Sequence, residues 1–473
     1  MVFSSSIFLL WFLPVFLVVY YFADRKYKNG VALFFSLLFY GFGSPKFLLI
    51  LLSSILIDFF LVRQIDRNQQ RRKLFLVLSV ILNIGLLAYF KYANFFVENF
   101  NALLSAFGAS PVKWTEVLLP IGISFFTFQK MSYSIDVYRK TSAPLKSIFD
   151  YALFIMLFPQ LIAGPIVRYN EIADQITDRR ANETIDNKLL GFYRFIIGLS
   201  KKMLIANILA EHVDKVFAMP ATEIGIGTAW LGIIAYTFQI YFDFSGYSDM
   251  AIGIGRMIGV KFPENFNNPY ISQSVSEFWK RWHITLGSWM MDYLYIPLGG
   301  NRKGKRRTYL NLWIVFFLSG FWHGAAWNFV AWGAFHGFFI VIDKLFWLKA
   351  SKKIGKLPRV LITFIVVTVG WVLFRADTLG YAIEYIGTMF GLHGTAPVAF
   401  SNPLFVFTMI IAFFFSFFGL IKAGDKVLDF FFNRKEYNIQ QYILVGILMI
   451  ILLMLSASFI LKGSFNPFIY FKF

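Results

Sequence analysis

The chain contains a series of long apolar segments with almost no charge, and these segments restrict its fold more than any other feature. Of its 473 residues, 58% are hydrophobic and 15% are charged, whereas a soluble domain carries about 25% charged residues. A transmembrane helix needs about 20 apolar residues. The apolar runs are continuous and do not alternate with polar residues, which disfavours a β-barrel. We therefore predict an all-α, polytopic membrane protein.

The apolar segments predict about 11 transmembrane helices. The segments near 116–135 and 245–300 are mixed in polarity and are expected to be re-entrant or interfacial, because irregular backbone at membrane depth must be buried or line water. No repeat or long linker divides the chain, so we expect one membrane domain over residues 1–473. The candidate spans are 5–23, 31–43, 46–62, 73–90, 148–166, 188–210, 225–243, 308–322, 326–346, 358–375, 402–422 and 440–461.

The positive charge of the chain is concentrated in short loops between apolar segments. Such loops face the cytoplasm by the positive-inside rule, which predicts that both termini lie on the outer face. The net charge of +19 is thus a topology signal, and we expect membrane lipids but no nucleic acid as partners. The chain has no cysteine, so disulfides and a catalytic thiolate are excluded.

One histidine, His323, lies between apolar segments that are predicted to form a helical hairpin. Basic loops at 302–307 and 344–359 flank the hairpin, so His323 is expected at its apex. An ionisable side chain at bilayer depth usually marks a functional site, and an imidazole can act as a general base near neutral pH. The alternative is a core histidine that is hydrogen-bonded between helices.

Two further histidines are candidates for the same site. His283 lies in a tract with three tryptophans and two basic residues, which could also be an interfacial aromatic belt with snorkelling cations. His336 follows His323 by thirteen residues and is assigned a packing or substrate-lining role. A metal site is not expected, because no two histidines are three or four residues apart and no acidic cluster accompanies them.

The stretch from 241 to 249 is dense in polar groups for an apolar region. Its polar side chains are predicted to line a hydrophilic passage, although a structural polar network is an equal alternative. Its buried carboxylates need partners, for which Lys280 and Arg281 are candidates. The predicted lining residues of this stretch are Asp243, Ser245, Tyr247 and Asp249.

Several ordered motifs of the chain resemble those of the membrane-bound O-acyltransferases. The most similar branch includes the alginate O-acetylation membrane protein and the D-alanyl transfer protein of teichoic acid synthesis. The alginate-type branch is favoured by Ile296–Gly304. The other matching motifs are Leu119–Gln129, Phe158–Arg168, Phe242–Asp249, Phe262–Tyr270, Phe278–Leu286, Tyr295–Gly300 and Phe321–Gly324.

This resemblance implies transfer of an acyl group, expected to be acetyl, from a thioester to a hydroxyl. The implied fold has helices around a central funnel, with an acyltransferase core at about 116–346. No bound cofactor is implied. The donor would be acetyl-CoA or a carrier-protein thioester on the cytoplasmic side of a bacterial inner membrane. The acceptor would be an exported polysaccharide such as alginate, served by a periplasmic or outer-face acetyltransferase.

Other functions remain open at this point. They are D-alanyl or other acyl transfer to teichoic acid or peptidoglycan, and a non-enzymatic transporter or scaffold in an export complex. A transporter usually shows paired repeats or broken helices in two halves, which the sequence lacks.

The resemblance also implies roles for individual residues. His323 corresponds to the invariant histidine of the family and His283 to the second histidine of this branch. The aromatic tail 465–473 resembles the tail of small membrane partners in the D-alanyl system, so Tyr470 is a candidate acyl shuttle; the alternative is an interfacial anchor. Further residues predicted to line the substrate site are Arg281, Trp282, Asn328 and His336.

Overall fold

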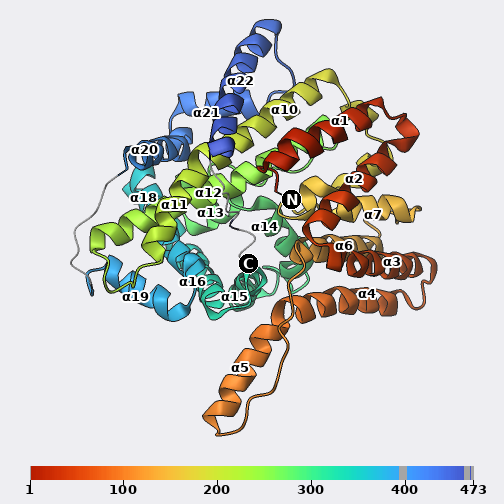
Figure 1. Cartoon of the computed structure of the whole chain (residues 1–473). Helices are drawn as coiled ribbons and strands as arrows, with labels where there is room; N and C mark the ends of the chain where they lie inside the picture. The colour runs from red at the N-terminus through yellow and green to blue at the C-terminus, as the bar shows by residue number, and fades with distance from the viewer. Residues whose placement is uncertain (1, 394–401, 463–468, 470–473) are drawn as a thin grey trace. The chain divides into compact units, whose positions relative to one another are not determined.

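The computed structural model describes residues 2–393, 402–462 and 469. In these residues every regular element is a helix, which confirms the predicted all-α class (Figure 1). The chain divides into two compact units. Unit 1 comprises Met1–Phe3, Ile7–Glu183 and Ile258–Phe262, and unit 2 comprises Ser4–Ser6, Thr184–Met257 and Pro263–Phe473. The prediction of a single domain over the whole chain stays a prediction.

Unit 1 is built from nine α-helices, of which α3 and α4 lie side by side (Figure 1). Pro45 occupies the first turn of α3, where its missing N–H costs nothing. The helices are α1 (Leu13–Phe22, preceded by a π-helical turn Phe8–Phe12), α2 (Lys28–Gly43), α3 (Pro45–Arg67), α4 (Arg72–Leu87), α5 (Ala93–Ala106), α6 (Ile123–Arg139), α7 (Ile148–Met156), α8 (Phe158–Leu161) and α9 (Tyr169–Thr177).

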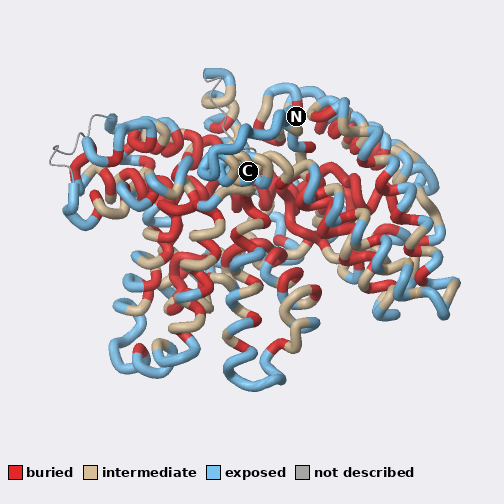
Figure 2. The backbone as a smooth tube through the Cα atoms, turned by 90° about the horizontal axis from the view of Figure 1, so that it is seen from below, coloured by how far each residue is buried: buried red, intermediate tan, exposed pale blue. Residues whose placement is uncertain are grey.

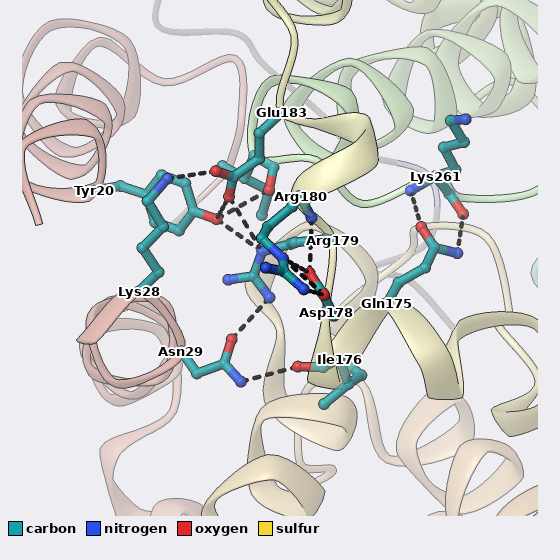
Figure 3. A network of polar contacts seen from close by, with 11 residues as sticks. Tyr20, Lys28, Asn29, Gln175, Ile176, Asp178, Arg179, Arg180, Glu183 and Lys261 are labelled. Carbon is teal, nitrogen blue, oxygen red and sulfur yellow. Dashed lines mark hydrogen bonds and ion pairs between the residues drawn. The ribbon is translucent and has the colours of Figure 1, made fainter. Parts of the chain in front are cut away.

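A polar network ties the ends of α1 and α2 to the segment that follows α9 (Figure 3). Tyr20 donates its hydroxyl hydrogen bond to the Ile258 carbonyl at 2.9 Å and accepts one from Arg179 Nε at 2.8 Å. Lys28 Nζ lies 2.6 Å from Glu183 Oε2. Arg179 also donates to Asn29 Oδ1 at 2.7 Å. The network therefore joins four chain segments through charged and hydroxyl groups rather than through apolar packing.

A second polar cluster is buried among α3, α4, α6 and α7 of unit 1. The carboxylate of Asp58, which is fully buried, accepts hydrogen bonds from Ser79, Asn83 and Tyr151. Lys130 Nζ donates to Ser54 Oγ at 2.9 Å. Buried polar groups in apolar helices are costly unless they are paired, so these bonds hold the four helices in register.

Unit 2 contains the remaining helices. A π-helical turn, Lys201–Ala206, joins α10 to α11, so these two helices run as one interrupted rod. The helices are α10 (Ile185–Ser200), α11 (Asn207–Phe217), α12 (Ile226–Met257), α13 (Val275–Arg281), α14 (Ile284–Met290), α15 (Gly304–His323), α16 (Trp327–Ile342), α17 (Leu348–Ala350), α18 (Lys356–Arg375), α19 (Leu379–Met389), α20 (Pro403–Phe417), α21 (Lys422–Phe432) and α22 (Ile439–Lys462).

Glycines allow the backbones of α10 and α12 to touch. A methyl group added to Gly198 would lie 2.5 Å from the carbonyl oxygen of Gly246, and one added to Gly191 would lie 2.7 Å from that of Gly253. Both pairs are seven residues apart on their own helix, so the contact repeats every two turns. Small residues at such crossings are typical of helix packing in membranes.

The exposed surfaces of many helices are apolar, as expected for a protein surrounded by lipid. Along α22, Ile443, Leu444 and Ile447 are more than half exposed, and Ile410 and Phe413 of α20 are similarly exposed. Contiguous apolar surface of this kind is rare on soluble proteins. Figure 2 shows buried and exposed residues alternating along many helices, which pack one face and expose the other, whereas α12 is buried along most of its length.

Six helical segments of the described residues are long and apolar enough to cross a membrane, and the predicted count of about 11 is therefore not confirmed. The expected span 148–166 is divided between the short helices α7 and α8. Helix α12 has 32 residues but carries the polar residues Gln239, Asp243 and Asp249 within it. The six segments are Pro45–Arg67, Arg72–Ala106, Trp327–Ile354, Lys356–Arg375, Pro403–Leu420 and Ile439–Lys462.

We predict that Gly198→Ala destabilises the protein, because its methyl group would overlap the Gly246 carbonyl. Overpacking of this kind costs about 1–3 kcal/mol. Gly85→Ala is the matched control, since no atom lies within 4 Å of its added methyl group. Thermal unfolding in detergent should show a lower Tm for Gly198→Ala and no loss for Gly85→Ala. An equal Tm for the two variants would contradict the close contact.

Candidate active site

The predicted hairpin is present in unit 2, and His323 lies at its apex. Helix α15 ends at His323 and α16 begins at Trp327 after a three-residue turn. The two helices approach closely one turn before the apex, where a methyl group on Gly320 would lie 2.3 Å from the Phe329 carbonyl oxygen. This crossing fixes the position of the last turn of α15, and with it the position of His323.

His323 is buried in an aromatic enclosure, with 4% of its surface exposed. Its ring centroid lies 5.1 Å from that of Trp332 on α16 and 5.3 Å from that of Phe374 on α18. The ring of His283 lies 6.3 Å away, tilted by 56°. The two histidines that the sequence singled out are thus neighbours, although 40 residues separate them in the chain.

His283 lies in the junction between α13 and α14, in a backbone conformation that few side chains adopt. Its φ of 47° places it in the left-handed region, which costs energy unless the surroundings enforce it. Asn265 supplies that enforcement. Its carbonyl accepts the N–H of Ile284 at 3.0 Å, and its Oδ1 accepts from Thr285 Oγ1 at 2.9 Å. The same Oδ1 lies 3.1 Å from His283 Nδ1.

The contacts of Asn265 determine the tautomer of His283. The Thr285 amide, which can only donate, lies 3.3 Å from Asn265 Oδ1 and identifies that atom as the carbonyl oxygen. His283 Nδ1 must therefore carry the proton, which leaves the lone pair on Nε2. Burial lowers the pKa of His283 to about 3. The imidazole is consequently neutral at neutral pH, and its Nε2 is a hydrogen-bond acceptor.

The carboxylates of the polar stretch on α12 have partners other than those the sequence suggested. Asp249 pairs with Arg194 at 2.7 Å and with Lys201 at 2.6 Å. Asp243 pairs with Lys202 at 2.5 Å. The expectation that Lys280 or Arg281 would neutralise these acids is therefore wrong. The basic partners come from α10 and its π-helical turn, whose backbone lies against α12 through the glycine contact.

The other predicted lining residues are distributed around the same part of unit 2. Arg281 pairs with Glu277 at 2.9 Å. Asn328 donates to the Ala376 carbonyl at 2.8 Å and so links the start of α16 to the end of α18. Trp282 is buried 4.9 Å from Trp371 between ring centroids. Two further residues, Ser245 and Tyr247, are buried on α12.

His336 is fully buried among aromatic rings, and like His323 it contacts Trp332. Its ring centroid lies 5.0 Å from that of Trp332 and 5.1 Å from that of Trp279. Neither ring nitrogen has a hydrogen-bond partner among the described residues. Trp332 therefore contacts two histidines, and its own indole N–H is likewise buried without a partner in the described part of the chain.

A cavity of about 440 Å³ lies within unit 2, and its lining residues include chain neighbours of both histidines but neither histidine itself. On α15 its wall includes Val315 and Ser319, and His323 is the next residue on that face of the helix. On α14 the wall begins at Ile284, directly after His283. Two cations, Lys280 and Lys344, also line it, while most of the remaining wall is apolar. The cavity could hold an elongated ligand with an anionic end.

Two further predictions concern Tyr470 and a metal site. Tyr470 lies outside the described residues, whereas its neighbour Ile469 is described and buried in unit 2. Within the described ranges, no group of three or more His, Asp or Glu side chains is arranged to hold a metal ion.

Comparison with known proteins identifies the family. Residues 122–374 match the model of MBOAT, the membrane-bound O-acyltransferase family. The chain belongs to this family. The matched residues include the whole segment from α12 to the end of the hairpin, and with it both histidines and the cavity.

Several curated relatives match most of the chain. A probable alginate O-acetylase AlgI of Pseudomonas putida is 42% identical, with 100% of both chains covered. A peptidoglycan O-acetyltransferase of Helicobacter pylori is 38% identical over 84% of this chain and 81% of its own length. A teichoic acid D-alanyltransferase of Bacillus subtilis is 30% identical over 54% of this chain and 68% of its own length. The chain is accordingly an acyltransferase, as the resemblance of its motifs implied.

The sequence did not reveal two residues on which the site depends. Asn265 lies within a motif that carried the resemblance, but nothing in the motif assigned it a role. Lys202 lies in an apolar segment, but the sequence alone did not distinguish it from the lysines of the loops. A buried lysine at helix depth was the available signal for Lys202, and no local pattern pointed to Asn265.

We predict that Asn265 acts on catalysis through His283. Asn265→Ala should lower kcat about tenfold or more, because the tautomer of His283 is no longer fixed. In Asn265→Asp the carboxylate should raise the pKa of His283. Imidazolium then forms as pH falls and the Nε2 lone pair is lost, so activity should decline on the acid side in this variant alone.

The pH profile of acyl transfer over about pH 5.5–8 checks this prediction, since His titrates in that range when a carboxylate raises its pKa. Asn267→Ala is the control, because Asn267 is exposed and its backbone bonds are kept. A profile of Asn265→Asp identical to that of the parent would show that Asn265 does not act through His283.

Proposed function

We propose that the protein transfers an acetyl group from a cytoplasmic thioester through the bacterial inner membrane, for O-acetylation of an exported polysaccharide such as alginate. The observation that carries this proposal is the pair of buried histidines, His283 and His323, whose ring centroids are 6.3 Å apart. The chain neighbours of both histidines line a cavity that also contains two lysines. The relatives named alginate O-acetylase, which match the chain over its whole length, support the acetyl group and the polysaccharide.

The donor is acetyl-CoA or a carrier-protein thioester, and its pantetheine arm enters the cavity. Lys280 and Lys344 attract the phosphate of the donor by charge. The apolar wall accommodates the arm, and the thioester reaches the end of the cavity where α14 and α15 lead to the histidines. No cofactor is held permanently.

His323 acts as the general base. It takes the proton from the acceptor hydroxyl, whose oxygen then attacks the thioester carbonyl carbon. When the tetrahedral intermediate collapses, the carbon–sulfur bond breaks and the thiolate leaves with the proton from His323. The acyl group is then an ester on the acceptor oxygen, and the imidazole is neutral again.

His283 Nε2 accepts the hydroxyl hydrogen only while the acceptor binds, because a hydroxyl donates a single hydrogen bond and donates it to His323 in the reacting complex. In the tautomer set by Asn265, a neutral His283 cannot donate from Nε2 to the oxyanion. The oxyanion therefore needs another donor. A backbone N–H or the buried indole N–H of Trp332, whose ring is 5.1 Å from that of His323, supplies it.

Tyr470 is the first acceptor in this scheme and carries the acyl group to the outer face. Both termini lie on that side by the distribution of basic loops. An outer-face acetyltransferase then moves the group from Tyr470 to the polymer. The burial of Ile469 in unit 2, the unit that contains both histidines, supports a tail that reaches the site.

Transfer of D-alanyl or acetyl groups to cell-wall polymers is the second candidate. The relatives named peptidoglycan O-acetyltransferase and teichoic acid D-alanyltransferase favour it. Purified protein supplied with acetyl-CoA or with a D-alanyl carrier thioester separates the two acyl groups. Cleavage of the D-alanyl thioester alone would replace the acetyl proposal.

We predict that His323→Ala abolishes thioester cleavage, because the neighbouring His283, whose pKa is lowered to about 3 by burial, is too weak a base to replace it. The measurement is release of free CoA from acetyl-CoA by protein in nanodiscs, which should fall about 10³-fold or more. His393→Ala, at an exposed position, should retain the parent rate. Full activity of His323→Ala in correctly inserted protein would refute the assignment of the base.

We predict that Tyr470 becomes acylated. Trypsin cleaves after Lys462 and Lys472, so the tail is released as the peptide 463–472. Its mass should increase by one acetyl group, about 42 Da, after incubation with acetyl-CoA, and Tyr470→Phe should remove this increase. Normal acetylation of the polymer by Tyr470→Phe would rule out an obligatory shuttle.

A further inference from the structure

The carboxylate of Asp243 uses both of its oxygens, and one of them contacts the C-terminal tail. Lys202 Nζ lies 2.5 Å from Oδ1. The backbone N–H of Ile469 donates a hydrogen bond to Oδ2 at 3.0 Å. Asp243 and Lys202 are 1% and 2% exposed, and Ile469 is 6% exposed. Ile469 is therefore bound to α12 through a charged acceptor in a buried environment.

The π-helical turn explains why Asp243 can serve the tail. The wide turn Lys201–Ala206 presents two consecutive lysines to α12, and they pair with Asp249 and Asp243 respectively. These carboxylates are six residues, or about 9 Å, apart along the helix. Lys202 neutralises Asp243 from one side only, so Oδ2 can accept a main-chain N–H from another segment.

The side chain of Ile469 packs into the apolar cluster that surrounds the active site. The same cluster contains Tyr241, Phe244 and Trp282. The ring of Phe244, which adjoins Asp243 on α12, lies 4.8 Å from the ring of His283. The anchor point of the tail and one of the two histidines are thus linked through adjacent residues of one helix.

We propose that Asp243 is the docking residue for the C-terminal tail at Ile469, and that this anchor is required for acylation of the next residue in the chain, Tyr470. This inference rests on the proposed role of Tyr470 as acceptor. A buried backbone N–H must find a partner, and a carboxylate is a strong one. Asp243 is therefore a positioning residue rather than a lining residue for the polysaccharide.

The first experiment measures docking without reference to chemistry. The chain has no cysteine, so Ile469→Cys introduces a single thiol whose reaction with a maleimide reports exposure of the tail. Labelling should be slow with Asp243 present and about tenfold faster or more with Asp243→Asn. The substitution replaces the charged acceptor of the Ile469 N–H by a neutral one, which weakens this hydrogen bond. Leu461→Cys, at a position 80% exposed, should react equally in both backgrounds.

The second experiment removes the donor and leaves the ion pair of Asp243 intact. Ile469→Pro has no N–H, whereas Ile469→Val keeps it and has nearly the same volume. In Ile469→Pro, acylation of the peptide 463–472 should fall about tenfold or more, with the KM for acetyl-CoA unchanged. Ile469→Val should remain close to the parent. A structural defect would instead change KM and lower Tm.

The outcomes separate this inference from the proposed function. If Asp243→Asn does not accelerate labelling, or if Ile469→Pro is acylated like the parent, the docking role is overturned. If Asp243→Asn frees the tail while the parent peptide carries no acyl group, docking stands and the shuttle role of Tyr470 fails. Faster labelling together with selective loss of acylation in Ile469→Pro supports both.

Discussion

The backbone contact between α10 and α12 is the constraint on which the rest of unit 2 depends. Because Gly198 and Gly246 have no side chains, the two helices approach until a methyl group on either would overlap the other backbone. At that separation the long side chains of the following π-helical turn reach across to α12. The charge pairs of Asp243 and Asp249 are therefore consequences of glycine packing, and a wider crossing would leave two carboxylates buried without partners.

The same requirement, that buried polar groups be paired, organises the catalytic side of α12. Asn265 accepts hydrogen bonds at the junction between α13 and α14 with its backbone carbonyl and with its side-chain oxygen. The side-chain contact also fixes the ring of His283. Aromatic rings fill the remaining space around His323. Exclusion of water strengthens each hydrogen bond to a reacting group, so burial that is costly for folding favours acyl transfer over hydrolysis.

The features that could be predicted from the sequence are those with local signals. Continuous apolar runs predict helices, and basic loops on either side of an apolar pair predicted the hairpin with His323 at its apex. The partners of the α12 carboxylates could not be predicted, because they depend on a π-helical turn that no propensity marks. Asn265 was missed for a similar reason, since its role depends on a contact across 18 residues of irregular chain. The predicted number of spans is not confirmed, and the expected span 148–166 is divided between the short helices α7 and α8.

The tautomer of His283 bears directly on how two histidines divide one reaction. A hydroxyl has one hydrogen to donate, so two neutral histidines cannot both accept it at once. With its Nδ1 proton bound to Asn265, His283 presents an acceptor at Nε2 and no donor. Its pKa, lowered to about 3 by burial, makes it a poor proton carrier and a good orienting acceptor. His323 lies at the end of α15, and its ring packs against those of Trp332 and Phe374. In the reaction that we propose, the lowered pKa of His283 is therefore a reason to assign proton transfer to His323 and not to His283.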